Sequence, residues 1–303
     1  MPKTATQAKI FALISGAAIS AFVGWPAQGA DSAHPDFAGF WGRNSFDPEA
    51  PDSGPGPLQN IKRLPNGTGD PQALVGDYHS PILRPEAAAI VKKQGDVSLS
   101  GDAFADPSNR CGAYSPPFTF AMQLGFQMLE AKDHITILYN QDDQVRRVRM
   151  NAKHPARVTP SAMGDSVGQW DGDTLVIDTV GVKLGPLTMA DRYGAPVSKD
   201  LHVIERYRLV DAAEAKAGAE KHEKANGRLG GGPGAMPVDT SYGKGLELKF
   251  TIDDPTYYTT PWSAQVHYLH TKLDWQEQVC AENFYEPYHG RYADIPAAPK
   301  PDF

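Results

Sequence analysis

The sequence lacks the features of a nucleic-acid binder, a metalloprotein or a long-helix protein. Its 303 residues carry 29 Lys and Arg against 36 Asp and Glu, a formal charge of −7, whereas nucleic-acid binding requires a basic face. No HExxH or CxxC motif occurs, and His267 and His270 stand three residues apart, so on a strand they point to opposite faces. The 29 Gly and 26 Pro residues argue against long uninterrupted helices, because both residue types interrupt them. We expect no metal, no cofactor and no nucleic-acid partner.

Long apolar runs are also scarce, and the clearest one stands at the beginning of the sequence. Lys3 and Lys9 precede the uncharged segment 10–23, and the small residues Ala27, Gly29 and Ala30 follow. This order is typical of a signal peptide, and the run is shorter than the ~20 residues of a membrane span. We expect cleavage of residues 1–30, export to the periplasm or medium, and no stable membrane insertion afterwards. Without the two lysines the charge becomes −9.

Cysteine is the scarcest of the chemically reactive residues, with Cys111 and Cys280 as the two examples. In an oxidising compartment such a pair can form a disulfide, which would connect the N-terminal region with the last predicted strand. Two buried free thiols are the alternative. No flanking sequence suggests a lowered thiol pKa, so a nucleophilic role is the weaker interpretation.

The chain divides into two parts after the leader. Residues 31–118, the N-terminal wrap, are rich in Pro, Gly, Asp and Asn and predict ordered coil around one short helix, which begins at Pro85 and ends at Gly95. Residues 119–303 predict a β-domain. The stretch 211–244 is an insertion whose Ala-, Glu- and Lys-rich first part suits a short helix and whose glycine run predicts a flexible loop.

Alternating apolar and polar residues after Phe118 predict about nine antiparallel strands with short connections. A polar Asp171-Gly172-Asp173 turn marks one hairpin. No long helical period alternates with the strands, so the fold is an all-β barrel or sandwich. The predicted strands span residues 126–131, 134–141, 145–150, 166–170, 174–182, 201–210, 245–254, 262–271 and 275–283.

The alternation places a carboxylate on an apolar strand face. Glu205 shares its face with Val203 and Tyr207, and Arg146 shares a face with Val148 on another strand. A buried carboxylate must be paired, hydrogen-bonded or protonated. We therefore expect Arg146 and Glu205 to meet inside the barrel, either as a structural ion pair or as part of a functional site.

Further polar and aromatic residues suit a small-molecule site, although a filled core is the alternative for the aromatic ones. The direction of Asp178 stays ambiguous, because both faces of its strand are apolar. His154 lies just after a strand, where an imidazole beside carboxylates suits general acid/base catalysis. The predicted substrate-binding residues are Arg146, Tyr139, Trp170, Asp191, Arg192, Trp262 and Tyr268.

Three segments together carry a resemblance to a known family. They are DFAGFW at 36–41, MGDSVGQWDGDTLVIDT at 163–179 and EQVCAEN at 277–283. They resemble a broad family of secreted, largely uncharacterised bacterial proteins with a GxSxGxW[ED]GDTLVVDT hairpin and a C-terminal EYACHEGN-like motif. Here Ala281 replaces the histidine of the last motif. The resemblance implies an antiparallel lipocalin-like (calycin-like) β-barrel, with Gly39–Trp41 compatible with its first strand, and brings no assigned reaction.

Three functional hypotheses follow. The first is an exported, cofactor-independent enzyme that uses Glu205 with His154 or Asp178 for proton transfer on an apolar or aromatic small molecule, as a lyase, isomerase or hydrolase. In it, Arg146, Arg192 and Tyr139 orient the substrate or stabilise negative charge. The second is a non-catalytic periplasmic binding protein, and the third is an envelope interaction module. Convergence of the polar residues on one cavity would favour the enzyme.

Overall fold

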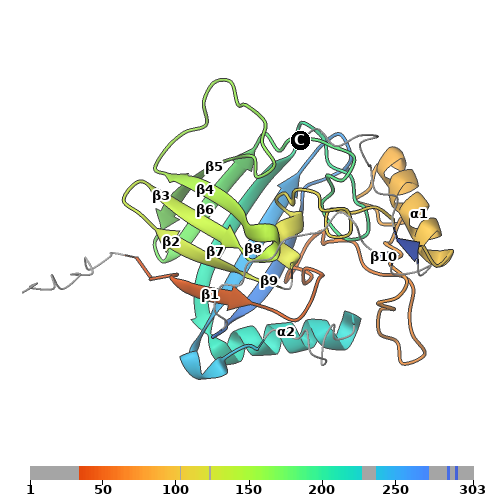
Figure 1. Cartoon of the computed structure of the whole chain (residues 1–303), viewed down its shortest axis with the longest axis horizontal. Coiled ribbons are helices and arrows are strands. Elements are labelled where there is room, and N and C mark those ends of the chain that lie inside the picture. Colours follow the sequence, from red (N-terminus) through yellow and green to blue (C-terminus); the bar gives the residue numbers. More distant parts are fainter. Residues whose placement is uncertain are drawn as a thin grey trace, which may run out of the picture. The chain divides into compact units, whose positions relative to one another are not determined.

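The computed structural model describes residues 34–102, 104–122, 124–226 and 237–272, and the backbone of 285–286 and 291–292. It confirms the all-β, lipocalin-like prediction: nine strands follow one another in chain order, and the last pairs with the first to close a barrel (Figure 1). The strands are β1 (Gly39–Gly42), β2 (Phe126–Glu130), β3 (His134–Tyr139), β4 (Gln144–Met150), β5 (Asp165–Asp171), β6 (Thr174–Val180), β7 (His202–Asp211), β8 (Lys244–Asp253) and β9 (Trp262–His270). Two short strands, β10 (Tyr285–Glu286) and β11 (Arg291–Tyr292), pair with each other.

The strand that closes the barrel comes from the N-terminal wrap. In β1, Trp41 pairs with Phe126 of β2 on one side and with His270 of β9 on the other. The barrel therefore takes one strand from the region before residue 118, at Gly39–Trp41, which the family resemblance gave as compatible with a first strand. The predicted strand 275–283 and the predicted signal peptide 1–30 lie outside the described residues.

One pair of neighbouring strands corrects the antiparallel prediction. β4 and β5 run parallel, with Val148 opposite Ser166 and Met150 opposite Gly168, whereas the other neighbouring pairs of the barrel are antiparallel. A parallel pair needs a connection of a dozen or more residues to return the chain to its starting end. The segment 151–164 between the two strands is long enough for that return.

Strand alternation places the core inside the barrel. Along β7, Val203, Glu205 and Tyr207 are buried, whereas Arg206 and Arg208 are exposed. The same rule buries alternate residues of β3, β6 and β8, so that the interior is filled mainly by aliphatic and aromatic side chains. The predicted inner face of Val203, Glu205 and Tyr207 on β7 is confirmed. The inner faces leave a packed interior, in which any polar group needs a partner from another strand.

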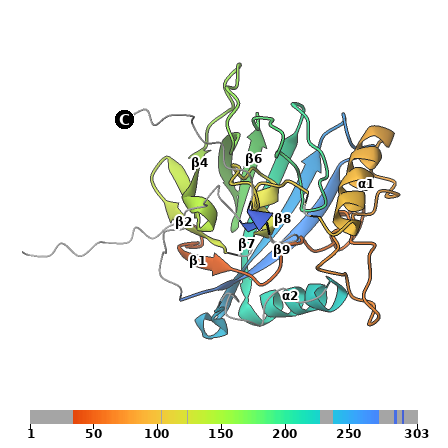
Figure 2. The ribbon, with the colours of Figure 1, turned by 45° about the vertical axis from the view of Figure 1, so that its right-hand side comes forward.

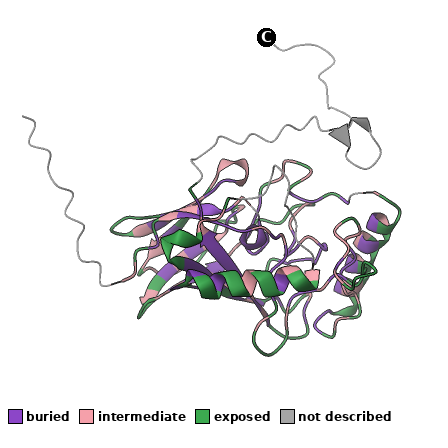
Figure 3. Cartoon of the chain, turned by 90° about the horizontal axis from the view of Figure 1, so that it is seen from below, coloured by how far each residue is buried: buried purple, intermediate pink, exposed green. Residues whose placement is uncertain are grey.

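Two helices pack outside the barrel. α1 (Pro85–Leu99) lies against the N-terminal wrap (Figure 2) and continues past Gly95, where the sequence predicted its end. A Cβ at Gly95 would lie 2.9 Å from Val75, so this glycine serves close packing. α2 (Ala212–Asn226) lies along β8 and β9 and carries both exposed and buried residues (Figure 3). Ala215 and His222 are among the buried ones. The helix that the sequence predicted in the first part of the insertion is confirmed as α2.

The N-terminal wrap closes one end of the barrel. It pairs with the barrel strands at Glu49–Gln265 and continues through Leu83–Tyr258, next to the start of β9. The short helix η1 (Phe118–Ala121) then leads the chain into β2. Within the described residues, neither helix is long and apolar enough to cross a membrane. The closed end, where the wrap meets the interior of the barrel, provides the largely apolar cavity described below.

Candidate functional site

The predicted meeting of Arg146 and Glu205 occurs inside the barrel. The guanidinium donates from Nη1 to Glu205 Oε2 at 2.9 Å and from Nη2 to Oε1 at 2.5 Å. It also donates to the Ser166 hydroxyl at 3.0 Å and the Thr179 hydroxyl at 2.6 Å. The Tyr207 hydroxyl donates to Glu205 at 3.0 Å. The Thr179 hydroxyl lies 3.4 Å from Oε1 as its donor, so each carboxylate oxygen accepts two hydrogen bonds from the protein.

The interior ion pair is closed to solvent. Arg146 is 1% exposed and Glu205 0% exposed. Tyr139 joins the cluster through the Arg146 guanidinium, and burial raises the pKa of its phenol. Burial opposes the charge of Arg146, but the nearby Glu205 carboxylate raises the pKa of the guanidinium. With every donor of the guanidinium engaged, the geometry is that of a structural ion pair.

His154 and Asp178 come together, but on the outer face of the barrel. His154 Nε2 lies 3.1 Å from Asp178 Oδ1, and His154 Nδ1 lies 2.5 Å from Asp165 Oδ1. His202 Nε2 contacts the same Asp178 oxygen at 2.8 Å. Asp178 is 37% exposed at its side chain, which resolves its direction as outward. The expected grouping with Glu205 does not form, because Glu205 lies on the opposite face of the sheet.

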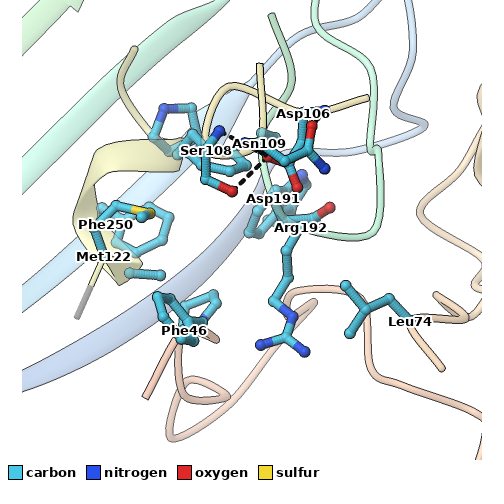
Figure 4. A pocket seen from close by; sticks show the side chains of 15 residues that line it. Phe46, Leu74, Asp106, Ser108, Asn109, Met122, Asp191, Arg192 and Phe250 are labelled. Atoms are coloured by element: carbon cyan, nitrogen blue, oxygen red, sulfur yellow. Dashed lines mark hydrogen bonds between the residues drawn. The ribbon is translucent and has the colours of Figure 1, made fainter. Parts of the chain in front are cut away.

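Three of the predicted substrate-binding residues meet at a third place. Asp191, Arg192 and Trp262 line a cavity of about 250 Å³ between the wrap, η1 and the interior of the barrel (Figure 4). Most of the lining is apolar. The lining residues are Phe46, Pro48, Leu74, Asp106, Ser108, Asn109, Pro117, Phe118, Ala121, Met122, Ala190, Asp191, Arg192, Phe250 and Trp262.

Asp191 is the most unusual polar group of this cavity. Its Oδ1 accepts backbone N–H groups from Tyr193 at 2.9 Å and from Ala195 at 3.1 Å, which fixes the carboxylate in a turn. Its Oδ2 is buried and has no hydrogen-bond partner among the described residues. Burial raises the pKa of Asp191 to about 6, against the effect of the two backbone hydrogen bonds and with a smaller contribution from Asp47.

The neighbouring Arg192 is largely buried and directed toward the wrap. Its Nε lies 3.6 Å from Asp47 Oδ1, and its guanidinium lies 5.8 Å from the centroid of the Phe46 ring. Figure 4 shows the side chain reaching toward Phe46 and Leu74. The charge of Arg192 is therefore balanced mainly by Asp47, which does not line the cavity.

Sequence reasoning missed the contribution of the wrap to this cavity. Asp106 Oδ1 accepts hydrogen bonds from Ser108 N at 2.7 Å, Ser108 Oγ at 2.5 Å and Asn109 N at 3.0 Å, a local turn that Figure 4 shows at the cavity edge. The Asp-Pro-Ser-Asn sequence signals such a turn. It carries no signal for the packing of that turn against the loop that holds Asp191.

The other predicted residues lie away from the cavity. Tyr268 is buried in the barrel, where its hydroxyl donates to the Phe120 carbonyl. Trp170 stacks on His34 with ring centroids 4.6 Å apart and packs edge-on against Phe37. Tyr268 is buried and Trp170 half-buried, and both have structural contacts with neighbouring residues.

The cysteine prediction is only partly covered by the structure. Cys111 is disulfide-bonded, and its expected partner, Cys280, lies outside the described residues. The participation of Cys111 in a disulfide removes the alternative of a free thiol at this position.

The described residues contain no group of three or more His, Cys, Asp or Glu side chains arranged to hold a metal ion.

Comparisons with protein-family models, with curated proteins and with solved structures find no match for the chain. The family resemblance of the three motifs stays a prediction.

Proposed function

We propose that the protein is exported and binds a small, largely apolar or aromatic molecule in the cavity lined by Asp191, Arg192 and Trp262. The observation that carries this proposal is the combination of apolar walls with a buried carboxylate oxygen that lacks a partner. Binding sites for small molecules are typically apolar cavities with a few placed polar groups. A volume of about 250 Å³ suits a ligand with a single ring.

The aromatic walls supply the apolar part of the proposed binding energy. Phe118 of η1 comes from one side of the cavity, and Phe250 and Trp262 come from β8 and β9. Burying apolar ligand surface contributes roughly 25 cal/mol per Å² before the cost of association. Export is supported by the leader-like residues 1–30, which match the order of charged, apolar and small residues in signal peptides.

A cavity-filling substitution tests the proposal. Ala121→Phe places a ring in the cavity, whereas Ala213→Phe adds the same ring on an exposed position of α2. In a thermal-shift screen of single-ring aromatic fragments, we expect some fragments to raise the Tm of the wild type and the α2 control. The same fragments should have no effect on Ala121→Phe. If all fragments act equally on the three proteins, the cavity is not the binding site.

Acid/base catalysis is the second candidate, with Asp191 in place of Glu205. The observation that favours it is the buried, unpartnered Oδ2 of Asp191 in the cavity, and burial raises the pKa of this carboxyl to about 6, toward the range in which a general acid or base works best. Asp191 would accept a proton from the bound molecule, in a lyase or isomerase type of reaction. A folded Asp191→Asn variant that converts the bound compound at the wild-type rate would remove this candidate.

A further inference from the structure

The charges around the cavity are unbalanced. Asp106 and Asp191 both line it, and among the described residues neither carboxylate has a cationic side chain within the 4.0 Å distance of a salt bridge. Arg192 is the lining residue with a positive charge, and its Nε lies 3.6 Å from Asp47 instead. Asp106 is 8% exposed and Asp191 6% exposed, so water compensates for little of this charge. A bound group of positive charge would complete the cavity.

The walls of the cavity suit a cation with an aromatic body. Phe46, Phe118, Phe250 and Trp262 surround the space beside the two carboxylates. Aromatic faces attract ammonium groups through their quadrupoles and pack against apolar rings at the same time. The buried Oδ2 of Asp191 offers the acceptor that an N–H group of such a ligand requires.

We propose that the ligand of this cavity is an organic cation, a primary or secondary ammonium attached to an aromatic or apolar body. In this arrangement the ammonium donates to Asp191 Oδ2, Asp106 contributes a second negative charge, and the body packs against Phe250 and Trp262. This inference rests on the proposed binding function, and it adds the charge and chemical class of the ligand.

The proposal has a pH dependence whose sign is fixed. The cation binds the ionised carboxylate, and the pKa of Asp191 in the free protein is about 6. Affinity should therefore be constant above that pH and fall by about tenfold per pH unit below it, because a proton must first leave. The phenols of Tyr193 and Tyr258 stay neutral, since burial raises their pKa well above 10. The titratable and charged groups that face Asp191 are Asp47, Asp106, Arg192, Tyr193 and Tyr258.

Calorimetric titration of the full chain with three probes of similar shape tests the inference. The probes are 2-phenylethylammonium, 2-phenylethanol and 3-phenylpropanoate, at pH 7.5. We expect the cation to bind at least about tenfold more tightly than the alcohol and the anion to bind most weakly. Asp191→Asn should reduce the affinity for the cation to that for the alcohol. Asp173→Asn, which removes the same charge from an exposed turn, should change nothing.

The possible outcomes separate this inference from the proposed function. If cation and alcohol bind equally and Ala121→Phe abolishes both, the binding function stands and the cation inference is wrong. Tightest binding of the anion would also overturn the inference, in favour of Arg192 as the recognition group. If none of the probes binds, or if Ala121→Phe leaves binding intact, both proposals fail. Should Asp191→Asn not fold, the pH profile of the wild type decides, because a flat profile between pH 5 and 7 contradicts the role of Asp191.

Discussion

At the scale of single residues, Glu205 shows what a carboxylate on an apolar strand face requires. Glu205→Gln keeps the shape of the side chain but leaves the Arg146 charge buried and uncompensated. We expect the free energy of unfolding to fall by about 3–5 kcal/mol, as for other broken buried ion pairs. Urea denaturation followed by circular dichroism measures this loss.

Two further variants distinguish the effect of breaking the ion pair from a general loss of stability on substitution. Replacing Arg146 and Glu205 together by Met removes both charges, so this double variant should lose less stability than Glu205→Gln alone. Glu214→Gln breaks an exposed pair with Arg208 and should change stability by less than about 1 kcal/mol. A Glu205→Gln variant as stable as the wild type would show that the interior pair is not structural.

The raised pKa of Asp191 predicts that the free energy of unfolding depends on pH in the absence of ligand. Its pKa is about 6 in the folded protein, because of burial, and 3.8 is the ordinary value of the unfolded chain. The folded state therefore binds the proton more tightly, and stability must fall as the pH rises through this interval. Asp191→Asn removes the effect, so its stability relative to the wild type should increase between pH 4 and 7 by up to roughly 3 kcal/mol. Chemical denaturation of both proteins at several pH values measures the difference.

A constant difference in stability between the two proteins across that range would contradict the raised pKa of Asp191. Asp173→Asn is the control, since this exposed carboxylate should show no comparable trend.

Residue positions were predictable from sequence only where one face of a strand is clearly apolar. Alternation along β7 placed Glu205 inward and led directly to its pairing with Arg146. It failed to decide the direction of Asp178, because residues 174–180 are apolar on both faces. The outward face of β6 is covered by the segment around His154, and this covering is a tertiary contact that no local pattern reports.

At the scale of elements, α2 packs closely against a buried histidine of β9. His267 Nδ1 lies 2.7 Å from Glu49 Oε2, and its Nε2 lies 3.6 Å from Glu247. Burial alone would lower the pKa of His267, but the hydrogen bonds to Glu247 and Glu49 raise it to about 9. A Cβ at Gly218 of α2 would lie 2.4 Å from the same imidazole. The helix therefore approaches the barrel at a point where only glycine fits.

Gly218→Ala tests this close approach. In a helix with free space, replacing glycine by alanine stabilises by about 1 kcal/mol. Here we expect the opposite sign, a loss of about 1–3 kcal/mol, because the imidazole is fixed by its carboxylate partners and cannot move aside. Urea denaturation gives the sign directly.

The double variant Gly218→Ala with His267→Ala provides the comparison. Gly218→Ala should be less destabilising in the His267→Ala background than in the wild type, because the obstructing ring is absent. Stabilisation of the wild-type chain by Gly218→Ala would mean that α2 does not pack closely here. The sequence suggested a helix at the start of the insertion. It did not explain the glycine in the middle of that helix, because the reason is the packing against His267 of β9.

At the scale of the whole molecule, the wrap and the barrel form one structure. The composition of the sequence changes at residue 118 and separates the two parts there. Composition indicates local conformation, but it does not indicate which strands pair with each other. The four residues of β1 lie within a Gly- and Pro-rich region and connect β2 with β9. Their pairing spans most of the chain, so a local pattern did not assign them to the barrel, and only the family resemblance gave Gly39–Trp41 as compatible with a first strand. The cavity has the same origin, since its lining combines the wrap with β8 and β9.

This arrangement predicts a single cooperative unfolding transition. Trp41 is fully buried, and its indole N–H donates to the Phe37 carbonyl at 2.9 Å. Trp41→Ala removes the largest side chain of β1 and should destabilise the protein by about 3–5 kcal/mol. Because the barrel cannot close without β1, far-UV circular dichroism and tryptophan fluorescence should shift together in urea. Trp41→Phe keeps a ring and should lose less. Two separate transitions, or a shift of the transition in only one of the two signals, would mean that the wrap folds independently of the barrel. The cavity between wrap and barrel would then open without unfolding either part.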